Sequence, residues 1–243
     1  MVSEPRHMED WGELPPRIIL RETDSTNRVA KELARQGAPH GSRVEAERQT
    51  AGRGRLDHSF FSPKGGVYLS VILRPDVPRE DWALITPMAA VAVRQAVNSI
   101  TDIELGIKWV NDLYLGDKKV GGILCEAVGD AVIVGVGLNV WEPEGGFPPE
   151  LNAAALNTKW PPETFSQLIY EKLLQGCQGL SYPGVPEDYV TCNIVLKRDL
   201  TVYPIHGAPY PARGKWIDRR GRLIVETAEG EKTLDSGEVS VRF

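Results

Sequence analysis

Glycine and arginine alternate in one short stretch of this chain, Gln49-Thr50-Ala51-Gly52-Arg53-Gly54-Arg55. Glycines allow several backbone N–H groups to converge on an anion, and arginine adds charge-assisted donors in a fork-shaped arrangement. The stretch therefore predicts a cradle for a phosphate or a carboxylate. A solvated loop with incidental arginines is the alternative, because motifs this short often occur by chance.

A second stretch brings a carboxylate and a lysine within reach of each other. Lys108-Trp109-Val110-Asn111-Asp112 is separated by the turn Gly116-Asp117 from Lys118-Lys119-Val120-Gly121-Gly122. A hairpin through that turn predicts that Lys119 lies near Asp112. The two charges form either a plain cross-strand ion pair, which this stretch alone favours, or an acid/base pair beside an anionic substrate.

A third stretch, Gly135-Val136-Gly137-Leu138-Asn139, places two glycines in an apolar, strand-like run. Glycine within a strand indicates tight packing or the close approach of a ligand. Asn139 is a candidate to hold a ligand hydroxyl or amide, and its alternative role is to cap a turn.

Composition limits the classes of protein to which these motifs can belong. The 243 residues include 28 Lys+Arg and 33 Asp+Glu, a formal net charge of −5, and 42% are hydrophobic. These values exclude a disordered or fibrous chain and give no support to a protein that coats nucleic acid. The acidic total nevertheless contains a cationic group near the motifs. This group comprises Arg48, Arg53, Arg55, Lys64, Lys108, Lys118 and Lys119.

Several common sites are missing from the sequence. There is no P-loop, GxSxG or HExxH motif, and neither glycine pair completes a dinucleotide fingerprint, because Asp57 and Val140 stand where the third glycine belongs. Cys125, Cys177 and Cys192 have neither zinc spacing nor the even number of a disulfide framework, which favours a reduced, cytoplasmic setting. The longest apolar runs are too short to span a bilayer.

The elements that must position these residues follow from hydrophobic periodicity and turn signals. Long amphipathic helices are predicted at 81–100 and 164–180, and a shorter helix begins at the N-cap candidates Asp24-Ser25-Thr26 and stops before Gly37. β-like runs are expected at 18–20, 43–47, 67–73, 104–108, 112–115, 118–128 and 131–140, with an irregular segment at 49–66. Clustered strands with few helices favour an α+β domain over alternating βαβ units.

A second, smaller unit is expected towards the C-terminus. Strand-like runs at 201–203, 210–217, 223–227, 231–234 and 239–243 alternate with hairpin-like turns, which is typical of a small SH3-like barrel. Proline and glycine around residues 181–188 mark a boundary. The predicted division is a loose arm at 1–17, a main domain at 18–188 and the barrel at 189–243.

Taken in order, the motifs resemble those of the biotin protein ligases, which attach biotin to a lysine of acyl-carboxylase carrier domains. The motifs are Ser25-Thr26-Asn27, the Gly-Arg stretch, Lys108-Trp109-x-Asn111-Asp112, Lys118-Lys119-x-x-Gly122-Ile123-Leu124-x-Glu126 and Gly135-x-Gly137-x-Asn139. The resemblance covers residues 24–139 and resumes at Lys197-Arg198-Asp199 and Ser236-Gly237-Glu238-Val239-Ser240. Five motifs in one order are far more specific than any one of them.

The resemblance implies a mixed sheet with helices packed on one side, of the class II synthetase type, plus the SH3-like barrel. It also implies an ATP-dependent ligase, with residues 18–188 as the catalytic domain that binds biotin and ATP. Biotin and ATP first form biotinyl-5′-AMP and pyrophosphate, and the carrier lysine then attacks the mixed anhydride and releases AMP. Biotin, ATP and Mg²⁺ are therefore expected, and the expected partner is the biotin carboxyl carrier domain of acetyl-CoA carboxylase or a related enzyme.

Residue roles follow from the same resemblance. Lys119, Asp112 and Arg53 are the expected catalytic residues, with Lys119 neutralising charge at the α-phosphate and Asp112 meeting the carrier lysine. Biotin is expected to contact Ser25, Thr26, Asn27, Gln49, Gly52, Arg53, Gly54, Arg55, Lys119, Gly122 and Gly135. ATP and the adenylate are expected to contact Arg53, Arg55, His58, Phe60, Lys108, Asn111, Lys119 and Asn139. The sequence does not identify ligands for a metal ion.

The chain departs from the family pattern at three positions. His58 and Phe60 stand where arginine and tryptophan are usual, so the loop has less permanent charge and lacks an indole N–H. Val110 replaces a proline, a change that affects mainly the rigidity of the turn.

Partners and rival functions complete the expectations. Only 17 residues precede Ile18, too few for the winged helix of the family's DNA-binding repressors, so no DNA binding is expected. No membrane association is expected either, because the apolar runs are too short to span a bilayer. A homodimer is left open. A lipoate or octanoate ligase of the same superfamily is the nearest alternative, although the Gly-Arg and Lys-Trp motifs favour biotin. A non-catalytic biotin- or nucleotide-binding module is the alternative from another class.

Overall fold

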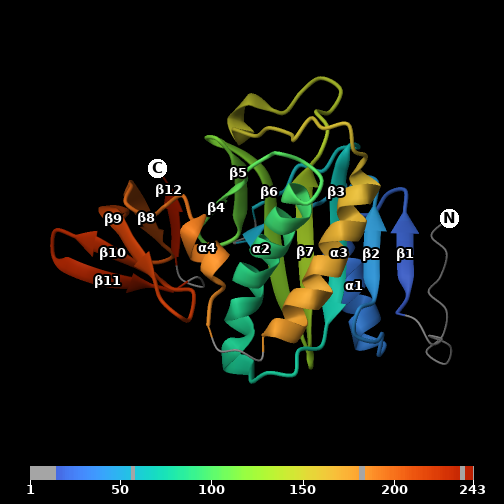
Figure 1. The fold of residues 1–243 in the computed structure, drawn as a ribbon, viewed down its shortest axis with the longest axis horizontal. Coiled ribbons are helices and arrows are strands. Elements are labelled where there is room, and N and C mark those ends of the chain that lie inside the picture. The colour runs from blue at the N-terminus through green and yellow to red at the C-terminus, as the bar shows by residue number, and fades with distance from the viewer. Residues whose placement is uncertain (1–14, 56–57, 181–183, 236–238, 243) are drawn as a thin grey trace.

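The computed structural model describes residues 15–55, 58–180, 184–235 and 239–242. Figure 1 shows a large sheet with two long helices in front of it and a smaller sheet at its side. The large sheet comprises β1 (Arg17–Leu20), β2 (Arg43–Ala46), β3 (Gly66–Leu73), β4 (Gly106–Lys108), β5 (Asp112–Leu115), β6 (Lys118–Val128) and β7 (Ala131–Asn139). The helices are α1 (Thr26–Arg35), α2 (Ile85–Asn98), α3 (Pro162–Gly179) and α4 (Glu187–Thr191). The small sheet comprises β8 (Asp199–Pro204), β9 (Tyr210–Ile217), β10 (Leu223–Thr227), β11 (Gly230–Leu234) and β12 (Val239–Arg242).

The large sheet is mixed. Its strand order is β1-β2-β3-β7-β6-β5-β4, in which β1 and β2 run parallel and each other neighbouring pair is antiparallel. α1 connects the parallel pair, since parallel neighbours require a crossover segment. The predicted α+β class is confirmed, and the strands lie at the predicted positions.

Both faces of the central strand β3 are buried, and the helices divide between them. Val71 and Leu73 lie in the apolar cluster that contains α2 and α3, whereas Ile72, which points the other way, packs with Ala30 and Leu33 of α1. The prediction of helices on one side is therefore correct for α2 and α3 and wrong for α1. Periodicity identifies the apolar stripe of a helix but does not indicate which face of a sheet covers it.

The α2 helix is shorter than the sequence predicts. Residues 81–84 belong to a 3₁₀ helix, Arg79–Leu84, and the α-helix begins at Ile85. Pro87 accounts for the difference, because in a longer α-helix its ring would collide with the carbonyl of Ala83, four residues earlier. Proline is tolerated in the first turn of a helix that begins at Ile85.

The small sheet is antiparallel throughout, with strand order β11-β10-β9-β8-β12. Its five strands lie where the sequence predicts them. Closure into a barrel stays a prediction, and so does the domain division at 188/189, which falls within α4. Residues 1–14 of the predicted arm and Ser236-Gly237-Glu238 of the C-terminal motif lie outside the described residues.

Two buried hydrogen bonds connect the large sheet to the C-terminal part. Trp109, directly after β4, donates its Nε1–H to the carbonyl of Gly221 at 2.9 Å, in the turn between β9 and β10. Tyr189 of α4 donates its hydroxyl to the carbonyl of Val110 at 2.8 Å. The peptide bond between Trp109 and Val110 is cis. The apolar core runs on from one sheet to the other, and these bonds hold the Lys-Trp motif at the junction.

Within the described residues, no helix combines the length and the apolar character that crossing a bilayer requires.

The Trp109–Gly221 bond predicts a difference between two tryptophan substitutions. Trp109→Phe leaves the buried carbonyl of Gly221 without its indole donor and should lower the free energy of unfolding by about 1–3 kcal/mol. Trp141→Phe removes an equivalent bond to Thr158 (3.0 Å) from a side chain that is 42% exposed, where water replaces the donor. Urea unfolding of both variants measures the difference, and equal shifts would contradict the structural role of Trp109.

Candidate active site

A cavity of about 210 Å³ opens on the face of the large sheet that α1 covers. Its walls come from the start of α1, the Gly-Arg loop, β4 to β7 and one residue of the small sheet. The lining residues are Ser25, Thr26, Asn27, Gln49, Arg53, Gly54, Arg55, His58, Ser59, Phe60, Lys108, Asn111, Asp112, Lys119, Gly122, Ile123, Leu124, Gly135, Val136, Gly137 and Val241. The structure thus brings together all the predicted site residues except Gly52 and Asn139.

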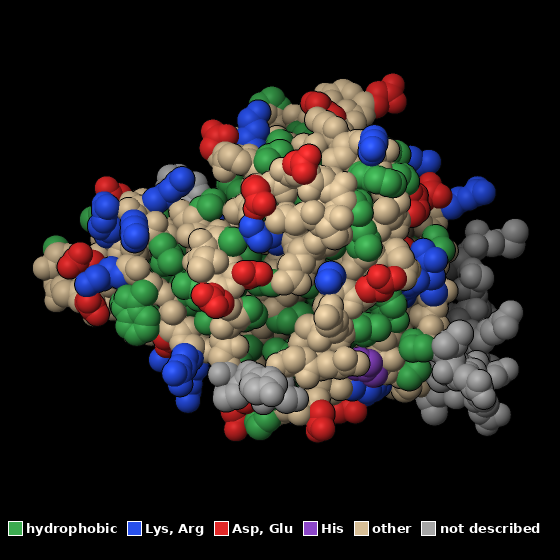
Figure 2. All heavy atoms as spheres, in the orientation of Figure 1, with side chains coloured by type: hydrophobic (Ala, Val, Ile, Leu, Met, Phe, Trp, Pro, Cys, Tyr) green, Lys and Arg blue, Asp and Glu red, His purple; other side chains and the backbone are tan. Residues whose placement is uncertain are grey.

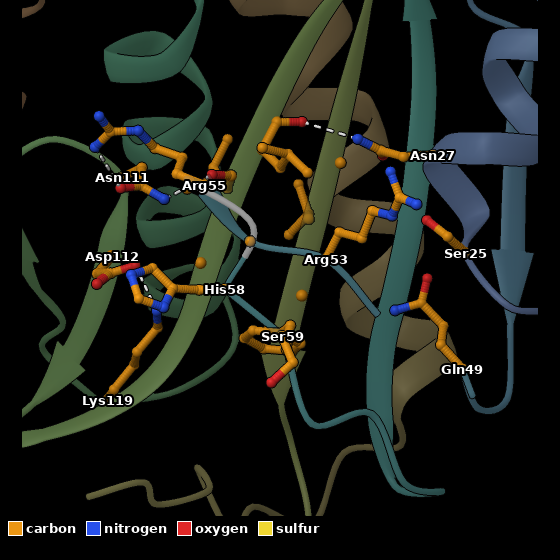
Figure 3. Close-up of a pocket in the computed structure, with 18 of the residues that line it drawn as sticks. Ser25, Asn27, Gln49, Arg53, Arg55, His58, Ser59, Asn111, Asp112 and Lys119 are labelled. Atoms are coloured by element: carbon orange, nitrogen blue, oxygen red, sulfur yellow. Dashed lines mark hydrogen bonds and ion pairs between the residues drawn. The ribbon is translucent and has the colours of Figure 1, made fainter. Parts of the chain in front are cut away.

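Neutral polar side chains form one end of the cavity (Figure 3). Ser25 is the N-cap of α1, and Thr26 and Asn27 are the first residues of the helix. Gln49 is held against them, because its Oε1 accepts the backbone N–H of Thr26 at 2.9 Å and its Nε2 donates to Ser62 Oγ at 3.0 Å. The capped helix start therefore presents hydrogen-bonding groups without net charge.

Charged side chains form the opposite end (Figure 3). Lys119 Nζ lies 2.6 Å from Asp112 Oδ1, which confirms that the hairpin brings the two residues together. Asp112 pairs with Gly122 across β5 and β6. A Cβ at Gly122 would lie 3.3 Å from Asp112 Oδ1 and 3.5 Å from Lys119 Nζ, so glycine leaves room for the ion pair and for a ligand beside it.

Arg55 extends the charged end. One of its Nη1–H groups donates to Asn111 Oδ1 at 3.4 Å, and Asn111 Nδ2 donates to the carbonyl of Ile123 at 2.8 Å. Burial lowers the pKa of Arg55, and the negative charge of Asp112 partly opposes that shift. A guanidinium that has lost much of its water gains more from a nearby anion than an exposed one does. The location of Arg55 therefore suits an anionic ligand.

The Gly-Arg loop folds back on itself above the sheet. The N–H of Gly54 donates to the carbonyl of His58 at 2.7 Å, and the N–H of Phe60 donates to the carbonyl of Gly52 at 2.8 Å. Arg53 forms an isolated β-bridge with Ser59, and its side chain extends towards Ser25, Asn27 and Gln49 (Figure 3). Leu56 and Asp57, which the sequence places in this loop, lie outside the described residues.

Two glycines of β7 allow the loop and α1 to approach the sheet closely. A Cβ at Gly137 would lie 2.5 Å from the ring of Phe60, and a Cβ at Gly135 would lie 2.2 Å from Asn27 Oδ1. Lys119 Nζ is 5.9 Å from the centroid of the same Phe60 ring. Tight packing is therefore confirmed, and because both glycines also line the cavity, the close approach of a ligand stays a prediction.

Gly52 and Asn139 were predicted to contact ligands but do not line the cavity. Asn139 is buried, and its Nδ2 donates to the carbonyl of Ala154 at 3.0 Å, so it orders the segment after β7. A Cβ at Gly52 would lie 2.4 Å from both the carbonyl oxygen of Phe60 and Ser62 Oγ, so this glycine allows the loop to fold back. A motif match does not separate such structural roles from contact with a ligand.

The predicted cationic group converges only in part. Its members in the lining are Arg53, Arg55, Lys108 and Lys119. Arg48 instead pairs with Glu22, Lys64 pairs with Glu47, and Lys118 is exposed. Sequence reasoning gave no ligand role to Ser59, Ile123, Leu124, Val136, Gly137 or Val241. Val241 had no signal, since β12 reaches the cavity only through the packing of the two sheets.

The described residues do not form a metal centre. No group of three His, Cys, Asp or Glu side chains among them is arranged to hold a metal ion. The cavity lining contains one carboxylate, Asp112, and it is paired with Lys119. Mg²⁺ requires a near-octahedral set of oxygen ligands, which this lining does not supply.

Family models match two parts of the chain. Residues 19–139 match the model described as "Biotin/lipoate A/B protein ligase family", and residues 217–242 match "Biotin protein ligase C terminal domain". The "Bifunctional ligase/repressor BirA" of Bacillus spizizenii is 32% identical over 232 residues, which cover 89% of this chain and 71% of that protein. The "Biotin--[acetyl-CoA-carboxylase] ligase" of Mycobacterium tuberculosis is 29% identical over 239 residues, which cover 94% of this chain and 89% of that protein.

A solved structure shares the whole architecture. "Biotin protein ligase from Aquifex aeolicus in complex with biotin and ATP" superposes with a TM-score of 0.81 and is 28% identical. The match covers 94% of this chain and 99% of the Aquifex chain.

The glycine floor of the cavity predicts a difference between two alanine substitutions. Gly135→Ala places a methyl group against Asn27 and should lower the free energy of unfolding by about 1–3 kcal/mol, because the packed side chain has to shift. Gly179→Ala is the control, since Gly179 lies at the end of α3 with no atom within 4 Å of the added Cβ. Thermal unfolding measures both, and a Gly135→Ala variant as stable as the control would contradict the contact.

Proposed function

This chain belongs to the biotin protein ligase family, and from that premise we propose that it is a biotin–[biotin carboxyl carrier protein] ligase. The observation that carries the proposal is the cavity with two unlike ends. Neutral hydrogen-bonding groups lie at the start of α1, and Lys119, Asp112 and Arg55 lie at the other end. Biotin has the same division, with an uncharged cyclic urea at one end and a carboxylate at the other.

The first step joins biotin to AMP. A biotin carboxylate oxygen attacks the α-phosphorus of ATP, and the bond to pyrophosphate breaks. Negative charge concentrates where two anions meet, so the cationic groups at this end have to lower their repulsion. Lys119 and Arg53 are proposed to contact the reacting carboxylate and α-phosphate, where fixed positive charge stabilises the transition state most effectively.

The second step transfers the biotinyl group. The carrier lysine attacks the carbonyl of the mixed anhydride, an amide forms and AMP leaves. The ammonium group must first lose a proton, because its ordinary pKa is about 10.4. Asp112 is proposed to orient this amine and accept its proton. In the free protein Asp112 is engaged by Lys119 at 2.6 Å, so an adenylate that attracts Lys119 would release Asp112 for the incoming amine.

The supporting molecules follow from the same proposal. ATP is the nucleotide, and Mg²⁺ is proposed to arrive bound to its phosphates, since the described residues do not form a site for the ion. The partner is the carrier domain of a biotin-dependent enzyme, and no DNA-binding role is proposed. Three cysteines free of disulfides support a cytoplasmic location.

A lipoate ligase is the second candidate, because one family model describes both activities. The neutral end of the cavity argues against it. A dithiolane ring carries no N–H or carbonyl group, so it would form no hydrogen bonds with the polar groups at this end, and it would displace water from them without replacing those bonds.

The transfer reaction tests the function directly. The protein is incubated with ATP and an apo carrier domain, with labelled biotin in one arm and labelled lipoate in the other. Label should appear on the carrier only with biotin, only with ATP, and together with pyrophosphate release. Transfer of lipoate alone would identify the second candidate, and binding of biotin without transfer would identify a non-catalytic module.

Lys119 and Asp112 should affect different steps. Lys119→Ala should slow pyrophosphate release by about 10²–10³-fold, because it removes charge stabilisation at the α-phosphate. Transfer from biotinyl-AMP supplied ready-made should be much less affected. Asp112→Asn should slow that transfer by about 10²-fold or more, because it removes the proton acceptor.

Lys118→Ala is the control for both steps, since Lys118 is the exposed neighbour of Lys119 and does not line the cavity. Single-turnover measurements separate the two steps. Equal losses in both steps for both site variants would contradict the division of roles.

A further inference from the structure

A glutamate outside the cavity lining sets the hydrogen-bonding direction of the neutral end. We infer that Glu126 of β6, held by Lys31 of α1, is a positioning residue that fixes the side-chain amide of Asn27. In the fixed orientation the amide oxygen, and not the nitrogen, faces the cavity and accepts a hydrogen bond from a ureido N–H. The inference rests on the proposed function, because it concerns how the urea ring is recognised.

The nitrogen end of Asn27 is fully used within the protein. Nδ2 donates to Glu126 Oε2 at 2.8 Å and to the carbonyl of Leu124 at 3.2 Å, which accounts for both of its hydrogens. Glu126 Oε1 forms an ion pair with Lys31 Nζ. Lys31 stands four residues after Asn27 on α1, so both side chains point from the same helix face towards β6.

The reversed amide orientation is excluded by the same contacts. It would turn the oxygen of Asn27 towards the Glu126 carboxylate and the Leu124 carbonyl, neither of which has a hydrogen to donate. Three acceptors would then meet at a side chain that is only 5% exposed. Glu126 therefore decides which end of the amide faces the cavity.

A buried serine, Ser70, connects Asn27 to Thr26 and restricts which of these groups can donate a hydrogen bond. Ser70 Oγ lies 2.6 Å from Asn27 Oδ1 and 2.8 Å from Thr26 Oγ1, but its hydroxyl has one hydrogen. An amide oxygen can only accept, whereas a threonine hydroxyl can also donate. The hydrogen of Ser70 therefore goes to Asn27 Oδ1, and the hydrogen of Thr26 goes to one of its two protein neighbours, Ser70 Oγ or Gln49 Oε1, which lies 3.1 Å away. Gln49 Oε1 keeps the backbone N–H of Thr26 as its donor.

The oriented oxygen lies on the floor of the cavity. A Cβ at Gly135 would lie 2.2 Å from Asn27 Oδ1, and Gly135 lines the cavity. Because the hydroxyl hydrogen of Thr26 is used within the protein in either case, the remaining lone pairs of Thr26 Oγ1 and Asn27 Oδ1 both act as acceptors. These two acceptors favour a ligand that supplies N–H donors, and a cyclic urea has two N–H groups.

The test compares ligands as well as variants. Calorimetry measures the Kd of biotin and of biotin methylated on either ureido nitrogen, for the wild type, Glu126→Ala and Glu126→Gln. For the wild type, methylation at one nitrogen should weaken binding by about tenfold or more, because a donor is lost at a wall of acceptors. In Glu126→Ala, where the amide can turn, biotin should bind about tenfold more weakly and the methylation penalty should shrink. Glu126→Gln retains an acceptor oxygen and should keep most of the discrimination.

A control variant and the pattern of Kd values distinguish a positioning role of Glu126 from a purely structural one. Glu32→Ala, an exposed glutamate on α1 outside this network, should match the wild type. Equal weakening of biotin and methylated biotin in Glu126→Ala, or no change in either, would overturn the inference while leaving the proposed function intact. A wild type that does not bind biotin would overturn both. If Glu126→Ala does not fold, Lys31→Met carries the test, and it should show a smaller loss of discrimination.

Discussion

The pairing of β6 with β7 determines the position of the cavity on the large sheet. In the observed register Gly122 faces Gly137 and Leu124 faces Gly135, so three glycines lie together on one face of the sheet. A shift of one residue between the two strands would place Gly122 on the opposite face of the sheet from Gly135 and Gly137. Asn27, Phe60 and the Lys119–Asp112 pair each rest against one of the three glycines. The register of β6 and β7 therefore creates the space for the cavity, and the side chains packed around the glycines then form its walls.

Local patterns in the sequence predicted much of this arrangement. Ser25-Thr26 carried a helix-cap signal, and the structure places Ser25 as the N-cap with Thr26 and Asn27 at one end of the cavity. The Gly116-Asp117 turn predicted the hairpin that joins Lys119 to Asp112. Both predictions rest on interactions between residues close in the chain, whose geometry is nearly fixed by backbone conformation. The motifs then identified the family together, because five motifs in one order are far more specific than any one of them.

Local sequence patterns could not predict the interactions between segments that are distant in the chain. The sequence pattern identified Ser70 only as part of a buried strand. Its contact with Thr26 and Asn27 exists because α1 packs on the face of the sheet opposite α2 and α3. The residues Gly52 and Asn139 matched motif positions, yet their partners are other parts of the protein. Net charge was equally uninformative. The chain is acidic overall, but four cationic side chains line the cavity with a single carboxylate.

The junction between the two sheets has a thermodynamic consequence. Trp109 bonds to the turn after β9, and Val241 of β12 reaches the cavity, so the ligand-binding surface is complete only while the sheets are docked. Any molecule that prefers the complete surface adds its binding free energy to the docking of the C-terminal part, by about 2.7 kcal/mol at a concentration 100 times its Kd. Ligand concentration thus sets the fraction of molecules in which the two sheets are separated, and that fraction falls as the site fills.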